Sequence, residues 1–157
     1  MTNVQIWDID GSIASPQILN SDEVGNAEIL KQSEVFEEAK KLLIEQFNNK
    51  DIIIIPTGRK GSLLGSFTRK QLSFIKGGFK AIYYPKDNTY DVYIPTKMKW
   101  FEGLVKKYKD DPTISSINFY DDDINICKET KNRFGTIQKI KIFQIKTENQ
   151  KWEKILF

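Results

Sequence analysis

Carboxylates gather in two short segments of this sequence. Asp8 and Asp10 lie one residue apart, and three consecutive aspartates follow much later, at positions 121–123. Residues two apart in an extended chain point the same way, so Asp8 and Asp10 are able to face one site. If Asp121 or Asp122 joins them, the cluster is unfavourable unless a cation binds or protons are taken up. A hard divalent cation with oxygen ligands, such as Mg²⁺, answers this need.

Groups that suit phosphate oxygens lie between these two acidic segments. Thr57, Gly58 and Arg59 offer a hydroxyl, backbone N–H groups and a guanidinium, and Lys97 and Lys99 add two ammonium groups. A carboxylate beside Mg²⁺ can attack phosphorus, and a second carboxylate can protonate the leaving oxygen and then activate water. These residue types indicate phosphoester hydrolysis through an aspartyl-phosphate.

The composition excludes several other chemistries. The 157 residues include no histidine, which removes Ser–His and Cys–His nucleophilic systems, histidine zinc sites and histidine general bases. The single cysteine, Cys127, permits no internal disulfide and indicates a reducing, cytoplasmic setting. The formal net charge of +3 is mild and does not by itself argue for a polyanionic partner. Neither a membrane-spanning run nor a secretory signal is visible.

Alternating strand and helix patterns must position the chemical groups. Strands are expected at 3–7, 51–55, 80–84, 116–120 and 139–145, and helices at 33–47, within 60–75, from Pro95 onwards and at 124–133. The tail, 148–157, is expected to pack as a helix or a coil. The alternation predicts one α/β domain over residues 1–157, a three-layer parallel sheet with helices on both faces. Each chemical segment follows a predicted strand or opens a predicted helix, at the edge where such sheets bind ligands.

In this order, the segments resemble the four motifs of the haloacid dehalogenase (HAD) superfamily. The run from Asp8 to Ser12 is similar to the first motif, Asp-x-Asp-Gly-Thr/Ser, and an apolar strand ending in Thr57-Gly58-Arg59 resembles the second. Lys99 resembles the lysine of the third motif and Asp121-Asp122 the aspartates of the fourth. Lys97 competes with Lys99, which is preferred because the apolar Met98 precedes it.

The resemblance implies a role for each residue. Asp8 would be the nucleophile, and Asp10 would be the general acid/base, with its main-chain carbonyl on the metal. Thr57 would bind the phosphoryl group and Lys99 would neutralise it. The implied catalytic residues are thus Asp8, Asp10, Thr57 and Lys99. The implied Mg²⁺ ligands are Asp8, Asp10, Asp121 and Asp122, and the implied substrate contacts are Gly58 and Arg59.

The intervals in which this superfamily inserts cap domains are short here. Neither 12–32 nor 85–94 can form a domain with its own core, so the site should be open to macromolecular substrates. The layout is most similar to the 3′-phosphatase domain of phage-type polynucleotide kinases and to related RNA-repair phosphatases, which implies action on DNA or RNA 3′-phosphate ends. Phosphatases of nucleotides, proteins or small phosphoesters are alternatives, as is a non-catalytic binding module that kept the fold.

Structural roles account for some of these residues equally well. Asp123 stands where the polynucleotide phosphatases often have arginine, and capping of a helix N-terminus would explain it. Arg59 is suited to contact phosphate or to pair with an acidic neighbour. Tyr83, Tyr84, Tyr90 and Tyr93 suit base stacking, but partly buried edge structure is the preferred interpretation. Trp7 and Trp100 are expected to pack beside the site.

Overall fold

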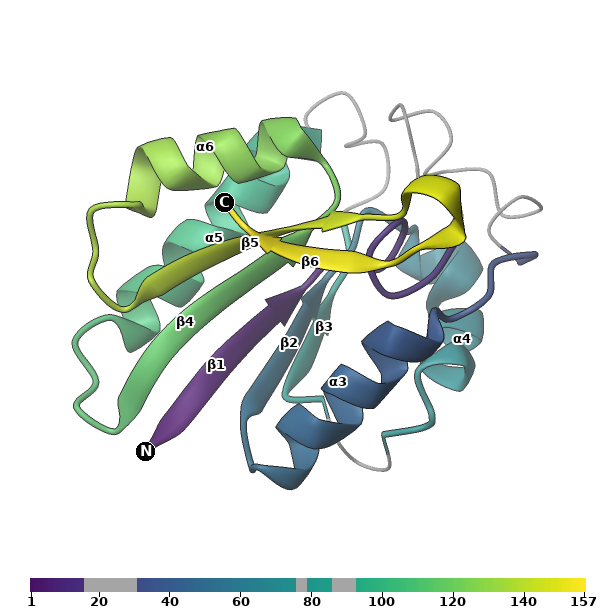
Figure 1. The fold of residues 1–157 in the computed structure, drawn as a ribbon, viewed down its shortest axis with the longest axis horizontal. Helices are drawn as coiled ribbons and strands as arrows, with labels where there is room; N and C mark the ends of the chain where they lie inside the picture. Colours follow the sequence, from purple (N-terminus) through teal and green to yellow (C-terminus); the bar gives the residue numbers. More distant parts are fainter. Residues whose placement is uncertain (16–30, 76–78, 86–92) are drawn as a thin grey trace.

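A six-stranded sheet of order β3-β2-β1-β4-β5-β6 forms the centre of the molecule (Figure 1). The computed structural model describes residues 1–15, 31–75, 79–85 and 93–157. Five strands run parallel, and the last is antiparallel to β5. The strands are β1 (Thr2–Trp7), β2 (Ile52–Pro56), β3 (Ala81–Tyr83), β4 (Ile114–Asp121), β5 (Ile140–Lys146) and β6 (Glu153–Leu156). The predicted parallel α/β sheet is confirmed.

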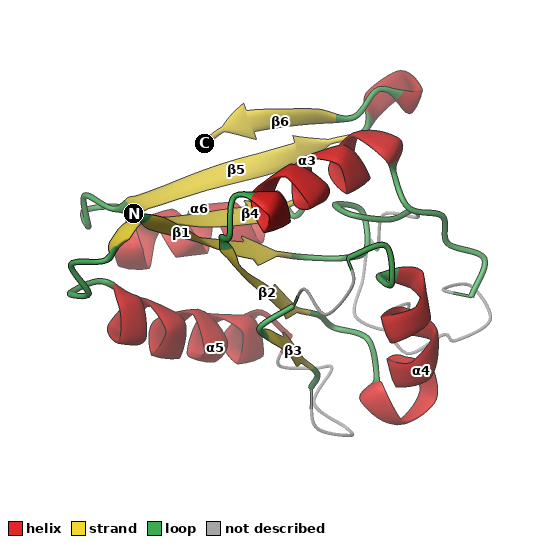
Figure 2. Cartoon of the chain, turned by 90° about the horizontal axis from the view of Figure 1, so that it is seen from below, coloured by secondary structure: helices red, strands yellow, loops and turns green. Residues whose placement is uncertain are grey.

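Four α-helices of the described residues connect the parallel strands and cover both faces of the sheet. They are α3 (Glu37–Asn48), α4 (Gly61–Gln71), α5 (Tyr93–Tyr108) and α6 (Ile124–Phe134). The connections run outward from β1 to β3, then return across the sheet to β4 and β5. Right-handed crossovers therefore place α3 and α4 on one face and α5 and α6 on the other, as Figure 2 shows. This is the predicted three-layer arrangement.

Each face of the sheet buries its own hydrophobic core. Ile54 of β2 packs with the helix face of α5, whereas Ile53 and Ile55 pack with Leu43 of α3. Successive side chains of a strand point to opposite faces, so a run of isoleucines fills both cores. The strand predicted to be buried on both sides is confirmed.

Two elements differ from their predictions. The helix expected from residue 33 begins at Glu37, because Val35 forms a β-bridge with Ala14 and holds the preceding chain extended. The tail, expected as a helix or a coil, contains a short 3-10 turn (Glu148–Gln150) and then the antiparallel strand β6. The tail does dock: the Trp152 indole N–H donates to the Ser12 carbonyl at 2.8 Å.

No cap domain is present among the described residues, whose elements all belong to the sheet, its helices and the short turn before β6. Residues 16–30 and 86–92, which make up most of the two intervals considered above, lie outside the described part of the chain. No helix in the described part is both long and apolar enough to cross a membrane.

Candidate active site

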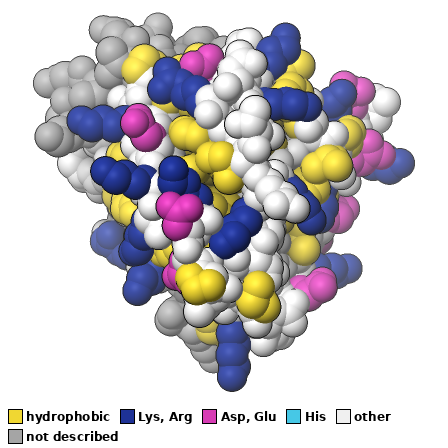
Figure 3. Space-filling model, turned by 90° about the vertical axis from the view of Figure 1, so that its left-hand side faces the viewer, with side chains coloured by type: hydrophobic (Ala, Val, Ile, Leu, Met, Phe, Trp, Pro, Cys, Tyr) yellow, Lys and Arg dark blue, Asp and Glu magenta, His cyan; other side chains and the backbone are white. Residues whose placement is uncertain are grey.

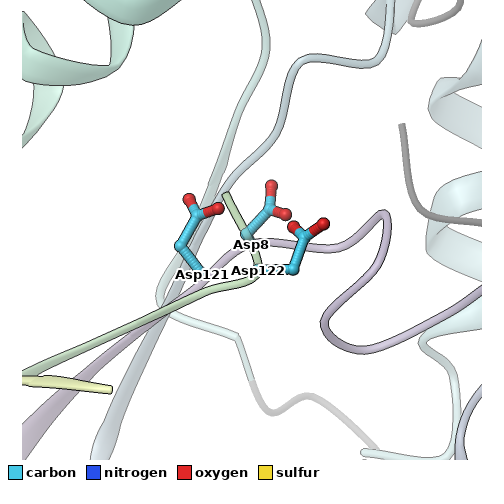
Figure 4. Close-up of side chains that lie close together, drawn as sticks. All are labelled: Asp8, Asp121 and Asp122. Atoms are coloured by element: carbon cyan, nitrogen blue, oxygen red, sulfur yellow. The ribbon is translucent and has the colours of Figure 1, made fainter. Parts of the chain in front are cut away.

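Three aspartates meet where β1 and β4 end. Asp8 follows β1, Asp121 ends β4, and Asp122 comes next. The backbone N–H of Asp8 donates to the Tyr120 carbonyl at 3.0 Å, which fixes the end of one strand against the other. Oxygens of the three carboxylates lie within 4.8 Å of one another, and the carboxylates point to the same side (Figure 4). All three residues are less than a tenth exposed, so the sheet brings these charges together in a buried place.

This acidic cluster resists ionisation in the absence of a cation. Burial, together with the Asp8 carboxylate, raises the pKa of Asp121 to about 7 and that of Asp122 to about 10, and Lys97 opposes both shifts. Three carboxylates against the one ammonium of Lys97 leave two negative charges. A divalent cation supplies the matching charge, and carboxylate oxygens are the donors that hard cations prefer. The donor set therefore fits a divalent metal ion.

Lys97, rather than Lys99, reaches the carboxylates. Its Nζ donates to Asp8 Oδ1 and to Asp121 Oδ2, both at 2.7 Å, and its side chain is fully buried. Lys99 is exposed and lines a separate pocket. The sequence-based preference for Lys99 as the site lysine is therefore corrected to Lys97.

Helix periodicity explains this correction and was a usable signal. The buried face of α5 includes Phe101 and Leu104, which lie one and two turns beyond Lys97. The same periodicity puts Lys99 with the exposed Glu102 and Gly103. A lysine on the apolar face of a helix is costly unless it is paired, so the phase of the helix identifies Lys97 as the lysine that faces the aspartates.

Gly11 allows the loop after β1 to close over the acidic cluster. Its φ of +85° is rare for residues with a side chain, and a Cβ added here would lie 2.3 Å from Asp122 Oδ2. The hydroxyl of Ser12 lies 3.4 Å from Asp8 Oδ2 and 3.5 Å from Asp122 Oδ1. The loop therefore brings backbone and a hydroxyl against two of the three carboxylates.

Asp10 pairs with Arg59 and is not part of the acidic cluster. Arg59 Nη2 donates to Asp10 Oδ1 at 2.7 Å, and Nε lies 3.1 Å from both oxygens. Burial raises the pKa of Asp10, and the hydrogen bond and charge of Arg59 oppose that rise. The main-chain carbonyl of Asp10 stays a predicted metal ligand.

Arg59 itself is fully buried and held by several side chains. Its Nη1 donates to Thr68 Oγ1 at 3.1 Å and to Gln71 Oε1 at 2.8 Å. Of the two roles considered from the sequence, the structure shows the pairing with an acidic neighbour, and this guanidinium orients the Asp10 carboxylate.

Thr57 is fixed at the end of β2, with Gly58 beside it at the same edge. The Thr57 backbone N–H donates to the Tyr83 carbonyl at 2.9 Å, and its Oγ1 accepts the Arg59 N–H at 3.1 Å. A hydroxyl that accepts through its oxygen still has a proton to donate. The Thr57 hydroxyl therefore keeps a proton that can be donated in a further hydrogen bond.

Asp123 has a structural role. Its carboxylate accepts the Asn125 N–H at 2.8 Å and so caps α6, as the capping interpretation predicted. Its own backbone N–H donates to Asp121 Oδ1 at 3.0 Å. The residue that departs from the polynucleotide-phosphatase pattern thus orients a member of the acidic cluster. Cys127 of the same helix is buried, as expected for a packing residue.

A layer of aromatic and amide side chains lies behind the aspartates, and of its members only Trp7 was expected beside the site. The rings of Trp7 and Tyr120 stack with centroids 4.0 Å apart and planes 6° apart. Gln46 accepts from the Trp7 indole at 2.9 Å and donates to the Tyr120 hydroxyl at 3.2 Å, and that hydroxyl donates to Gln5 at 2.8 Å. Trp7 and Tyr120 directly precede Asp8 and Asp121, so the network fixes both strand ends. Gln5, polar within an apolar strand, was the signal in the sequence.

The chain resembles solved structures of known proteins. No protein-family model and no curated protein matches the chain. Among solved structures, the HAD domain of effector protein Lem4 from Legionella pneumophila is similar, with a TM-score of 0.56 and 15% identity over 94% of this chain and 88% of that one. The fold is that of a HAD domain.

A second similar structure is a chain of the Pnkp1/Rnl/Hen1 complex. Its TM-score is 0.55 at 15% identity, over 92% of this chain and 46% of that chain. The chain described here thus spans about half the length of that protein. The similarity to the Lem4 domain confirms the HAD fold that the four motifs implied.

Proposed function

We propose that this HAD-fold chain is a divalent-metal-dependent phosphomonoesterase that forms an aspartyl-phosphate on Asp8. The observation that carries the proposal is the buried convergence of Asp8, Asp121 and Asp122 beside Lys97. Buried like charges are costly to a fold, and a metal-dependent reaction gives them a purpose.

In the first half-reaction, a carboxylate oxygen of Asp8 forms a bond to phosphorus while the bond from phosphorus to the leaving oxygen breaks. Lys97 holds Asp8 Oδ1 at 2.7 Å, which leaves Oδ2 as the attacking atom. Asp10 donates a proton to the leaving oxygen. Its Oδ1 accepts two N–H groups of Arg59 and its Oδ2 accepts one, at 3.1 Å, so Oδ2 is the atom that carries the proton.

In the second half-reaction, Asp10 takes a proton from a water molecule as the water oxygen bonds to phosphorus. The bond between phosphorus and Asp8 breaks, which releases inorganic phosphate and restores both carboxyl groups. Thr57 and Lys97 bind the phosphoryl oxygens throughout. Mg²⁺, held by Asp8, Asp121, Asp122 and the main-chain carbonyl of Asp10, would offset negative charge on the phosphoryl group.

The substrate class that we propose is nucleic acid with a 3′-phosphate end, either DNA or RNA. The motif layout resembles polynucleotide 3′-phosphatases, and no cap domain covers the site among the described residues. We further expect a reducing, cytoplasmic setting, which suits the buried free thiol of Cys127. A non-catalytic binding module would be favoured by the absence of the arginine that polynucleotide phosphatases often have at position 123. It has less support, because capping of α6 gives Asp123 a structural role there.

Release of phosphate in the presence of Mg²⁺ tests the proposal. The substrates are a 3′-phosphorylated oligonucleotide, a 5′-phosphorylated one, mononucleotides and an aryl phosphate. We expect turnover that prefers the 3′-phosphorylated oligonucleotide and is abolished by chelation and by Asp8→Asn. Asp110→Asn, the same change at an exposed position, is the matched control. Full activity in Asp8→Asn would contradict the mechanism, and activity only on small esters would contradict the substrate class.

A further inference from the structure

An open pocket of about 670 Å³ lies beside the candidate active site, between the end of β3 and one face of α5. Thr96, Lys99, Trp100 and Lys107 line it from α5, at positions that recur with helical spacing. Tyr83, at the end of β3, also lines the pocket, and its ring lies next to that of Trp100, with the centroids 6.0 Å apart and the planes tilted by 39°. The pocket thus has a pair of neighbouring aromatic rings, one from β3 and one from α5, and ammonium groups along α5.

The pocket adjoins the residues proposed to bind the phosphoryl group. The Tyr83 carbonyl accepts the Thr57 N–H at 2.9 Å, so one wall of the pocket is bonded directly to the second motif. On α5, Thr96 immediately precedes Lys97, whose Nζ contacts Asp8. A molecule in this pocket therefore lies next to a phosphoryl group held by Thr57 and Lys97.

The charge of the pocket favours an anionic occupant. Its lining includes Lys99 and Lys107 and no acidic residue. Within the described ranges, neither lysine lies within ion-pair distance of a carboxylate. By contrast, the face of the molecule where β1, β4 and β5 begin interleaves basic, acidic and hydrophobic side chains (Figure 3). Aromatic rings interspersed with unpaired cations are the combination by which proteins bind single-stranded nucleic acid, through base stacking and phosphate contacts.

We propose that this pocket binds single-stranded nucleic acid, namely the nucleotides next to the terminal phosphate that is hydrolysed at Asp8. The inference rests on the proposed function for the position of that phosphate. Trp100 and Tyr83 stack on bases, and Lys99 and Lys107 contact the backbone phosphates.

The pocket also sets the direction of the strand. The α5 residues from Thr96 to Lys107 cover about 16 Å of helix, at about 1.5 Å per residue. This length matches roughly four to five stacked nucleotides at about 3.4 Å each. Because Thr96 lies at the catalytic edge, the phosphorylated end of the strand lies there and the chain runs along α5 toward Lys107.

Two measurements on the full chain test the pocket. The first compares KM for a short 3′-phosphorylated oligothymidylate with KM for an aryl phosphate. The second measures binding of the unphosphorylated oligothymidylate by fluorescence anisotropy of a dye on the DNA, which needs no catalysis. The variants are Trp100→Ala and Lys107→Ala. Lys106→Ala is the matched control, because Lys106 is an exposed lysine of the same helix outside the pocket lining.

We expect Trp100→Ala to weaken oligothymidylate binding by roughly 5- to 100-fold, the usual effect of losing one stacking ring. Trp100→Ala should also raise KM for the oligonucleotide more than KM for the aryl phosphate, by a similar factor. Lys107→Ala should reduce the slope of log Kd against log salt by about 0.7, as expected when one phosphate contact of a single strand is removed. Lys106→Ala should leave that slope at the wild-type value.

The results separate this inference from the proposed function. If 3′-phosphate ends are hydrolysed and Trp100→Ala and Lys107→Ala bind the oligonucleotide as the wild type does, the inference about the pocket is wrong and the proposed phosphatase activity stands. If these variants lose oligonucleotide binding but the protein hydrolyses no ester, the inference about the pocket stands and the proposed phosphatase activity is wrong. Equal increases in KM for the oligonucleotide and the aryl phosphate would also contradict the proposed role of the pocket. Since Trp100 is partly buried and its removal could damage the fold, Lys107→Ala supplies the same test from an exposed position.

Discussion

Replacing Lys97 by methionine gives a sharp test of how the candidate site is held together. The change keeps a long aliphatic side chain but removes an ammonium group that is fully buried and lies 2.7 Å from both Asp8 and Asp121. Breaking a buried ion pair by removing one partner typically costs about 3–5 kcal/mol, because the remaining charge is left unpaired. For a chain of this size, each kcal/mol lowers Tm by about 2–4 °C, so we expect a drop of roughly 6–20 °C without metal.

The cost should depend on pH. Asp121 has its pKa raised to about 7, so below that pH its carboxyl is mostly neutral and has less need of Lys97. We therefore expect the difference between wild type and Lys97→Met to be larger at about pH 8 than at about pH 5. Thermal unfolding followed by circular dichroism in the presence of a chelator measures it at both pH values.

Lys99→Met is the matched control for stability. Lys99 is exposed, and surface substitutions usually change the free energy of unfolding by less than about 0.5 kcal/mol. If Lys97→Met and Lys99→Met have the same Tm at both pH values, Lys97 does not hold the acidic cluster, and its ion pairs do not contribute to the stability of the fold.

Three further predictions concern the same edge of the sheet. Gly11→Ala should cost on the order of 1–3 kcal/mol from its φ of +85° and, because its Cβ would displace the Asp122 carboxylate, should abolish the rise in Tm that Mg²⁺ gives the wild type. Without metal, burial raises the pKa of Asp121 to about 7, so the contribution of this carboxyl to stability is fully present below its unfolded pKa of 3.8 and is lost as pH rises through about 7; added Mg²⁺ should reverse that loss in thermal melts. Arg59→Lys, which cannot reproduce the paired N–H groups on Asp10, should lower kcat for an aryl phosphate by roughly 100-fold, and an unchanged kcat would show that Arg59 does not orient the acid.

The sheet and the acidic cluster follow from patterns visible in the sequence. The isoleucine run of β2 required burial on both faces, and apolar strands ending in aspartate or threonine placed polar groups at one edge. The strand order then brings these polar groups together, because adjacent parallel strands have their carboxyl ends side by side whatever their separation in the sequence.

Other features of the site depend on contacts between distant segments and could not be predicted from the sequence. Whether Arg59 contacts a substrate or Asp10 is decided by the partners Thr68 and Gln71, which position its guanidinium from α4. The strand β6 escaped prediction because it is short and exposed along its whole length, so it lacks the alternation of apolar and polar residues that marks a half-buried strand. Lys97 differs from both, since helical phase alone was sufficient to find it.

The docking of Trp152 gives the molecule a built-in spectroscopic reporter. Its indole donates to the Ser12 carbonyl and lies 6.4 Å from the stacked ring of Trp7, while the third tryptophan, Trp100, lies in the pocket along α5. Emission from Trp7 and Trp152 should therefore respond when the loop after β1 adjusts to a cation, and emission from Trp100 should be quenched when bases stack on it. With Trp100→Phe, the first signal could be followed separately, so that metal binding and strand binding are timed independently in the same protein without an attached dye.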